Sequence, residues 1–344
     1  MKPILGITMG DPSGCGPEIT VKAFLHEAMY EKCRPFVVGD AATIERAARE
    51  AVKRDNINVR RVSSVKDCRF EPGTIDVFDL HNVEGSKLKI GEVDAMSGNA
   101  AFTSVTKVIE LALAKEIDAT ITNPLNKEAL NVAGHHYAGH TEIYAEFCNT
   151  KDYSMMLVHG DLRVVHVSTH VSLREACERV KKERVLKVIE LAEDICTNLG
   201  IKNPKIGVAG LNPHAGEHGM FGREEIEEII PGINVAKGKG INAEGPVPPD
   251  TLFPKACGGM FDIVVAMYHD QGHIPLKLLG FQYNKNTGSW HTVNGVNITL
   301  GLPIIRSSVD HGTAFDRAWQ GSANESSLLS AIEYGALLAK GNRT

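Results

Sequence analysis

Short apolar runs that break into polar or glycine-containing turns recur along the whole chain. Several runs are almost continuously apolar, which is the pattern of strands in a parallel sheet covered on both faces. Eight runs predict strands: PILGITM, RPFVVG, TIDVFDL, DATITNP, YSMMLVHG, LRVVHVST, KIGVAGLNP and FDIVVAMYHD.

Between these runs, apolar residues stand three and four positions apart, which predicts helices with one buried face. The predicted helices cover residues 17–31, 41–54, 97–116, 172–199, 222–239 and 322–341. Alternating strands and helices indicate an α/β protein in which the last helix packs back on a sheet. The sequence has no internal repeat and no Ser/Gly-rich linker, so its composition marks no domain boundary.

Length and charge narrow the class of protein. A chain of 344 residues is long enough for about two domains with a sizeable core. The first apolar run is soon broken by Asp11 and Pro12, and no run is as long as a membrane helix, so we expect a cytoplasmic protein. The seven cysteines show no CxxC spacing and are expected to be reduced. A net charge of −5 without basic clusters favours a small-molecule partner over nucleic acid.

The loop GDPSGCGPE follows the first predicted strand and has two interpretations. Gly10, Gly14 and Gly16 free the backbone, and with Asp11 they are candidates for binding the cofactor at a helix N-terminus. The alternative is a tight strand-to-helix turn without a ligand. The loop matches neither GxGxxG nor GxxxxGK[ST], so it carries neither the dinucleotide fingerprint nor the P-loop.

Three histidines stand where predicted strands end: His170 in STH, His214 in LNPHAGE and His269 in MYHDQG. Strand ends are where open α/β sheets bind ligands. Three neutral imidazoles suit a borderline divalent metal. Taken singly, each histidine is more often structural, and spacing does not tell whether His166 points the same way as His170. No HExxH is present, which excludes a zincin protease.

Eight motifs in chain order resemble the 4-hydroxythreonine-4-phosphate dehydrogenase family. They span residue 4 to about residue 320: ITMGDPSGCGPE, TNPLNKEAL, GHTEIYAEF, STHVSLREA, GLNPHAGE, PPDTLF, AMYHDQGHIPLK and GVNITLGLPIIRSSVDHGTAFD. The resemblance implies a two-domain fold like that of isocitrate and isopropylmalate dehydrogenases, with the active site in the cleft between the domains. We expect residues 1–125 and 307–344 in the first domain and residues 126–306 in the second, which carries the metal ligands and the interface of a homodimer.

The same resemblance assigns roles to site residues. It implies a divalent metal (zinc, magnesium, manganese or cobalt) on His170, His214 and His269, with His269 coming from the partner subunit. The substrate contacts would be His140, Thr141, Lys277, Asn297 and Arg306. Lys277 is the candidate for proton transfer or anion positioning, and Asp270 for orienting a metal ligand.

The family oxidises a secondary alcohol β to a carboxylate with NAD, and the β-keto acid product loses carbon dioxide. Segments such as HIPLKLLGF and HGTAFDRAW look more like the catabolic branch, which acts on 4-phospho-D-threonate or 4-phospho-D-erythronate. The alternative is the dehydrogenase of pyridoxal phosphate (vitamin B6) biosynthesis.

The stretch between Lys277 and Asn297 is longer than we expect in the family. Its NKNTG core predicts an exposed β-hairpin within residues 282–295, placed beside the cleft. Two further classes stay open: a metal-dependent hydrolase or lyase of a phosphorylated acid, which would not use NAD, and a binding protein without activity. The second predicts loss of metal ligands, but all three histidines are in place.

Overall fold

The computed structural model describes residues 1–285, 289–293 and 295–341. It divides the chain into two compact units, Met1–Lys151 with the residues from Leu302 onward, and Asp152–Gly301. These boundaries differ from the expected 125/126 and 306/307. The physical reason is local. Residues 126–151 form two helices that pack on the long helix of the first unit, which moves the first boundary to residue 151. The backbone N–H of Thr120 donates to the carbonyl of Ile305, which joins the residues before 306 to the first unit as well.

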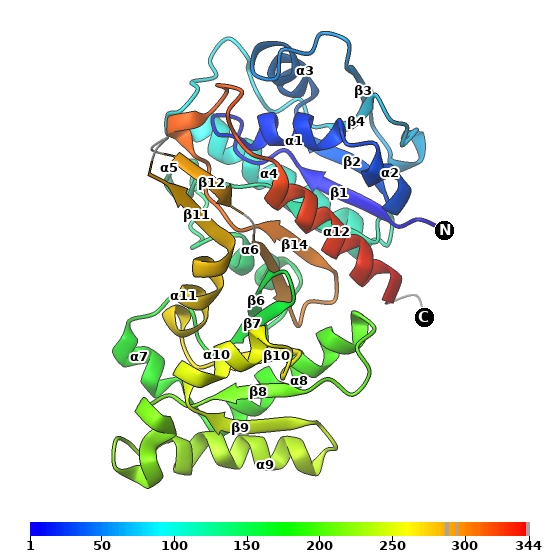
Figure 1. The fold of residues 1–344 in the computed structure, drawn as a ribbon. Helices are drawn as coiled ribbons and strands as arrows, with labels where there is room; N and C mark the ends of the chain where they lie inside the picture. The colour runs from blue at the N-terminus through cyan, green and yellow to red at the C-terminus, as the bar shows by residue number, and fades with distance from the viewer. Residues whose placement is uncertain (286–288, 294, 342–344) are drawn as a thin grey trace. The chain divides into compact units, whose positions relative to one another are not determined.

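The first unit is a parallel sheet covered on both faces (Figure 1). Its strands, in sheet order, are β3 (Asn58–Val62), β4 (Thr74–Asp79), β2 (Arg34–Gly39), β1 (Ile4–Thr8), β5 (Ala119–Thr122) and β14 (Arg306–Val309). Its helices are α1 (Gly16–Phe24), α2 (Ala28–Lys32), α3 (Ala41–Glu50), α4 (Ala95–Leu113), α5 (Lys127–Val132), α6 (His140–Phe147) and α12 (Ser326–Gly341). Helices α1 and α12 cover one face, and α4 covers the other.

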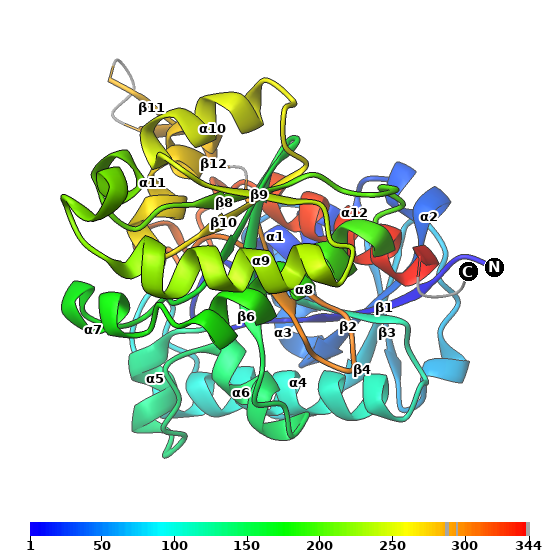
Figure 2. The same ribbon diagram turned by 90° about the horizontal axis from the view of Figure 1, so that it is seen from below.

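The second unit has a mixed sheet. Its strands, in sheet order, are β13 (Val296–Leu300), β6 (Ser154–His159), β7 (Leu162–His166), β10 (Ile263–Ala266), β8 (Ile206–Ala209) and β9 (Ala243–Val247). Its helices are α7 (Leu173–Glu178), α8 (Lys182–Asn198), α9 (Ile230–Gly238), α10 (Pro249–Cys257) and α11 (His269–Gly280). Helices α8 and α9 pack on one face of this sheet, and α10 and α11 pack on the other (Figure 2).

All eight predicted strands are present, which confirms the α/β class. The parallel arrangement holds for β7, β10, β8 and β9, whereas β6 runs antiparallel to both of its neighbours. Only two residues, Gly160 and Asp161, separate β6 from β7, and a link this short allows only a hairpin. Gly160 has a positive φ of 56°, which glycine tolerates in such a turn.

Two predicted helices are interrupted. Residues 172–199 form α7 and α8, because Lys181 is extended and the backbone N–H of Lys182 donates to the carboxylate of Glu228, which caps the start of α8. Residues 17–31 form α1 and α2. The predicted hairpin is confirmed: β11 (Phe281–Asn284) pairs antiparallel with β12 (Ser289–Val293). Residues 286–288 of its NKNTG core lie outside the described residues.

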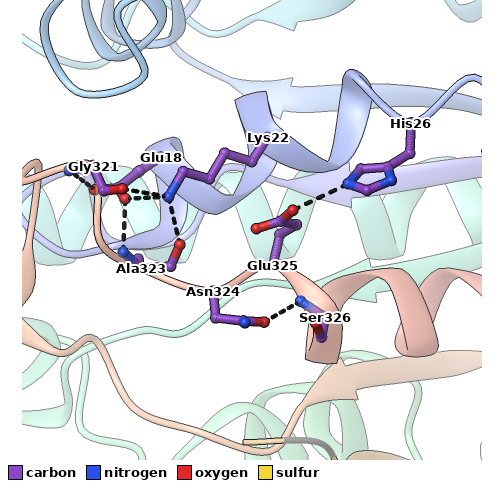
Figure 3. A network of polar contacts seen from close by, with 8 residues as sticks. All are labelled: Glu18, Lys22, His26, Gly321, Ala323, Asn324, Glu325 and Ser326. Carbon is purple, nitrogen blue, oxygen red and sulfur yellow. Dashed lines mark hydrogen bonds and ion pairs between the residues drawn. The ribbon is translucent and has the colours of Figure 1, made fainter. Parts of the chain in front are cut away.

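The C-terminal helix is attached to α1 by a polar network (Figure 3). The buried Glu18 carboxylate accepts hydrogen bonds from the backbone N–H groups of Gly321 and Ala323, and Lys22 donates to the carbonyls of the same two residues. These contacts hold the segment before α12 in place. They also give hydrogen-bond partners to backbone groups that α1 shields from water. No described helix is long and apolar enough to cross a membrane.

Candidate functional site

Two of the three predicted metal ligands lie next to each other in the second unit. His170 follows β7 and His269 follows β10, and these two strands are parallel neighbours, so both histidines leave the sheet at the same edge. Their ring centroids are 5.9 Å apart. Both rings line a pocket of about 460 Å³, whose lining residues are Thr169, His170, Val171, Ser172, Leu173, Ala176, Tyr268, His269 and Asp270.

Asp270 sets the tautomer of His269. Its Oδ1 lies 2.7 Å from the Nδ1 of His269. Because a carboxylate only accepts, the His269 proton is on Nδ1, and the lone pair of Nε2 is available for a cation. A carboxylate on the remote ring nitrogen is the usual support of a metal-binding histidine. The donor chemistry of His269 therefore fits a divalent metal.

The third predicted ligand, His214, is exposed on the loop after β8. Residues His214, Ala215, Glu217 and His218 have positive φ values between 41° and 55°, an unfavourable conformation for side chains with a Cβ. The His214 ring lies 6.4 Å from the ring of Phe221, and within the described part of the chain it makes no ring contact with His170 or His269. Among the described residues, no three His, Cys, Asp or Glu side chains are grouped so that they could hold a metal ion.

Glu225 anchors this loop, and the sequence analysis did not single it out. The side chain is buried and accepts hydrogen bonds from the backbone N–H groups of Leu211 and Asn212 and from the Asn212 amide. A buried carboxylate with several donors restrains the start of the loop that carries His214. The sequence does carry a signal for Glu225, since it is an acidic residue at a position that the helical pattern predicts to be buried.

His166 and His273 are two further histidines beside His269. The rings of His273 and His269 stack with centroids 3.6 Å apart, and the rings of His273 and His166 lie 4.8 Å apart. Burial lowers the pKa of His166 to about 4 and that of His273 to about 2, so both imidazoles are neutral at physiological pH. The i, i+4 spacing of His269 and His273 was the sequence signal for this stack.

Lys277 and Asn297 are also in the second unit. Lys277 lies eight residues after His269 on α11, and its Nζ stands 5.1 Å from the ring centroid of Phe281. Asn297 on β13 donates from Nδ2 to the sulfur of Met155, 2.9 Å away, while its buried Oδ1 has no hydrogen-bond partner among the described residues. The amide oxygen is therefore able to accept from a ligand.

The remaining predicted substrate contacts meet in the first unit. Arg306 at the start of β14 is 2% exposed, and its guanidinium donates to Thr122 Oγ1 at 3.0 Å and lies 3.5 Å from Thr141 Oγ1. Burial lowers the Arg306 pKa to about 10, which still leaves it cationic at neutral pH. His140, at the start of α6, is brought to the same place.

The electrostatics of this group favour an anion. Burial, with Arg306 and Lys127 nearby, lowers the His140 pKa well below its ordinary value. The Nε2 of His140 is buried and has no hydrogen-bond partner among the described residues. A buried guanidinium with hydroxyl groups and an imidazole around it is suited to a phosphate or carboxylate.

The GDPSGCGPE loop is folded as a tight turn. Its residues are buried, and the N–H groups of Ser13, Gly14 and Cys15 donate to Asp11 Oδ1, Asp11 O and Thr313 O. A Cβ on Gly16 would overlap the carbonyl of Met9, so this glycine allows a close approach of backbone to backbone. Because these donors are used within the protein, the geometry favours the turn interpretation over a phosphate-binding role for Gly10, Asp11, Gly14 and Gly16.

The chain is similar along its length to proteins named as dehydrogenases. A D-threonate 4-phosphate dehydrogenase of Cupriavidus necator is 47% identical over 98% of this chain and 97% of its own, and that of Salmonella typhimurium is 46% identical over 97% and 98%. The crystal structure of a 4-hydroxythreonine-4-phosphate dehydrogenase from Klebsiella pneumoniae matches with a TM-score of 0.86 at 43% identity, covering 98% of this chain and all of that one. A family model described as pyridoxal phosphate biosynthetic protein PdxA matches residues 31–335, and the chain therefore belongs to the PdxA family.

Proposed function

We propose that this protein is a metal- and NAD-dependent dehydrogenase that oxidises and decarboxylates a 4-phosphorylated 3-hydroxy acid, with 4-phospho-D-threonate or 4-phospho-D-erythronate as substrate. The observation that carries the proposal is full-length similarity to enzymes named D-threonate 4-phosphate dehydrogenase. The cationic group around Arg306 and the imidazoles around His269 are consistent with such a substrate, which has anionic ends and a hydroxyl between them.

The phosphate or carboxylate is held by the group in the first unit. Arg306 supplies a planar donor pair, Thr141 a hydroxyl and His140 an imidazole nitrogen. Burial of Arg306 strengthens its attraction for an anion because little water screens the charge. Asn297 supplies a further acceptor for a substrate hydroxyl.

The metal would be held by His170, His214 and His269, with one of the three supplied by a second subunit. Imidazole donors favour zinc or cobalt over magnesium. When bound, such a metal acidifies the substrate hydroxyl and polarises the ketone that follows. Asp270 keeps the Nδ1 proton of His269 in place, so that the lone pair of Nε2 would be the one to hold the metal.

The atoms of the reaction balance with NAD as co-substrate. With NAD⁺ bound, the carbon that bears the hydroxyl would lose a hydride to it, and the hydroxyl would lose its proton to a base. The bond to the carboxylate then breaks, releasing carbon dioxide, and the resulting enolate takes up a proton. Lys277 is the residue we assign to holding or moving that proton at Nζ, since it lies on the same helix as His269. The GDPSGCGPE turn is not assigned to NAD.

A homodimer is part of the proposal. Helix α11 presents Ile274, which is 64% exposed, and Leu278, which is 79% exposed, one turn apart on the same side. Large apolar side chains in this arrangement are typical of a subunit interface. A second copy seated here would lie beside the helix that carries His269 and Lys277.

A kinetic comparison tests the function. The purified protein is supplied with Zn²⁺, Co²⁺ or Mg²⁺ and with NAD or NADP, and NADH absorbance and carbon dioxide release are followed for three acids. These are 4-phospho-D-threonate, 4-phospho-D-erythronate and 4-hydroxythreonine 4-phosphate. The highest kcat/KM is expected for one of the first two.

One alternative rests on a specific observation. Two solved structures that match at 43–44% identity are called 4-hydroxythreonine-4-phosphate dehydrogenases, which favours a role in vitamin B6 biosynthesis. Preference for 4-hydroxythreonine 4-phosphate in the same assay would establish that role instead. Turnover of any of the acids without NADH would show a hydrolase or lyase.

A further inference from the structure

A column of three imidazole rings runs inward from His269. His273 stacks on His269 with an angle of 12° between the ring planes, and the tilted ring of His166 lies 4.8 Å from that of His273. His269 lies at the protein surface, His273 is 7% exposed and His166 is fully buried. Neither buried ring has a role in the reaction proposed above.

Hydrogen bonds fix both inner rings. The Nδ1 of His273 lies 2.9 Å from the carbonyl of His269, and the Nδ1 of His166 lies 3.1 Å from the carbonyl of Met155. A carbonyl only accepts, so both rings carry their proton on Nδ1. Each ring is therefore tied to the backbone, and neither is free to rotate away from the stack.

Gly272 makes this column possible. A Cβ built on this glycine would overlap the Nε2 of His166 and would also press on Val164 of β7. The missing side chain lets α11 approach β7 closely enough for the His166 ring to lie against the helix. His166 in turn packs against His273, which restricts the movement of the His273 ring.

The hydrogen bond that His269 donates to Asp270 does not by itself immobilise the His269 ring. The Asp270 side chain is 69% exposed, and an exposed polar contact constrains a ring weakly because water competes for it. Face-to-face packing restricts rotation about the remaining side-chain torsions. A ring already ordered before a ligand arrives loses less conformational entropy on binding.

We propose that His273 is a positioning residue for His269: its ring holds the His269 imidazole so that Nε2 is presented to a divalent metal, and His166 and Gly272 support His273 in that position. The inference rests on the proposed function, in which His269 is a metal ligand. A neutral ring stacked on a metal-bound, electron-poor imidazole adds a favourable electrostatic contact.

Two variants test whether the planar ring of His273 is needed or only the space that it fills. His273→Phe keeps a planar ring against His269, whereas His273→Leu fills similar space without one. Metal affinity is measured in the intact protein by Co²⁺ absorption and by chelator competition with Zn²⁺. We expect His273→Leu to weaken affinity about tenfold or more, the range typical for loss of a ligand's supporting contact, and His273→Phe to stay within a few fold of wild type. His26→Leu, at an exposed histidine in the first unit, is the matched control.

The outcomes distinguish the inference from the function. If wild type binds Co²⁺ and His273→Leu binds it equally well, the positioning role is wrong while the proposed function stands. If wild type binds no divalent metal yet oxidises its substrate, the metal part of the proposed function fails and the inference fails with it. A thermal unfolding curve for each variant separates lost affinity from lost folding. Gly272→Ala, which pushes His166 outward, should weaken metal binding in the same direction as His273→Leu.

Discussion

Glu18 and Lys22 form a 2.8 Å ion pair one turn apart on α1, and both ends of the pair also hold the segment that leads into α12 (Figure 3). The Glu18 side chain is fully buried. In Glu18→Ala, the Lys22 ammonium loses its anionic partner and keeps only two carbonyl acceptors, while two backbone N–H groups lose their acceptor. We expect a loss of about 3–5 kcal/mol in the free energy of unfolding, the cost typical of breaking a buried ion pair. Urea denaturation followed by circular dichroism measures this value.

The same network contains its own control. His26 and Glu325 form a more exposed pair, with side chains 48% and 25% accessible. Removing this pair by Glu325→Ala should cost only about 0–1 kcal/mol, because solvent screens it. Equal losses for the two variants would show that the buried Glu18 contacts do not hold the segment before α12.

The buried Asp11 makes stability depend on pH. Burial raises its pKa from 3.8 to about 6, and its Oδ2 has no hydrogen-bond partner among the described residues. The folded state therefore binds this proton more tightly than the unfolded state. The resulting stabilisation is complete below pH about 4 and is lost as pH rises through about 6.

Asp11→Asn removes this titration while keeping an acceptor for the N–H of Ser13. A shift of about two units corresponds to roughly 3 kcal/mol. Between pH 4 and pH 7, the unfolding free energy of wild type should therefore fall relative to that of Asp11→Asn by about this amount. Parallel stability curves for the two proteins over this range would mean that Asp11 is not desolvated in the folded state.

Arg306 should determine substrate affinity. Arg306→Lys keeps the positive charge but loses the planar donor pair near Thr122 and Thr141. We expect KM for the phosphorylated acid to rise about 10- to 100-fold, the effect of losing a charge-assisted hydrogen bond. The control is Arg163→Lys, since Arg163 donates to the carbonyls of Asp161 and Asp262 in the other unit. An unchanged KM for Arg306→Lys would place the anion elsewhere.

The strands were predictable because their signal is local. An apolar run identifies a strand from its own residues, without knowledge of the strands that pair with it. Four strands of the two sheets were not predicted: β3, β9, β13 and β14. β3 and β14 are largely polar, so they carry no apolar run. β9 contains Gly245 and Pro246, residues depleted in strands, and an edge strand tolerates them. The antiparallel direction of β6 depends on the two-residue link to β7, a geometric constraint that apolar character does not carry.

The candidate site, unlike the strands, is built by contacts between residues that are far apart in the sequence. Arg306 and Thr141 are 165 positions apart, and they meet because β14 pairs with β5 and α6 packs beside them. Only the resemblance to a family associated these two residues. His273 was within reach of pattern alone, one helical turn from His269, whereas the burial of His166 became evident only with the packing of α11 on β7.

Sharing of the metal site between subunits can be tested by mixing inactive variants. His170→Ala and His269→Ala should each be inactive as homodimers. If His269 serves the site of the other subunit, a mixed dimer contains one site that lacks both ligands and one that is intact. Random mixing makes half of the dimers mixed, so activity should recover to about a quarter of wild type.

The His170 and His269 rings lie 5.9 Å apart within one chain, so the alternative is that both serve the site of the same subunit. If both histidines serve the same subunit's site, every site in the mixed dimer lacks one ligand, and no activity returns. Mixed dimers are isolated with two different affinity tags, and Co²⁺ stoichiometry is measured beside activity. One Co²⁺ bound per mixed dimer, with the recovered rate, supports sharing. No tight Co²⁺ binding and no rate would assign both histidines to one chain, with the rest of the site completed by His214 or by substrate.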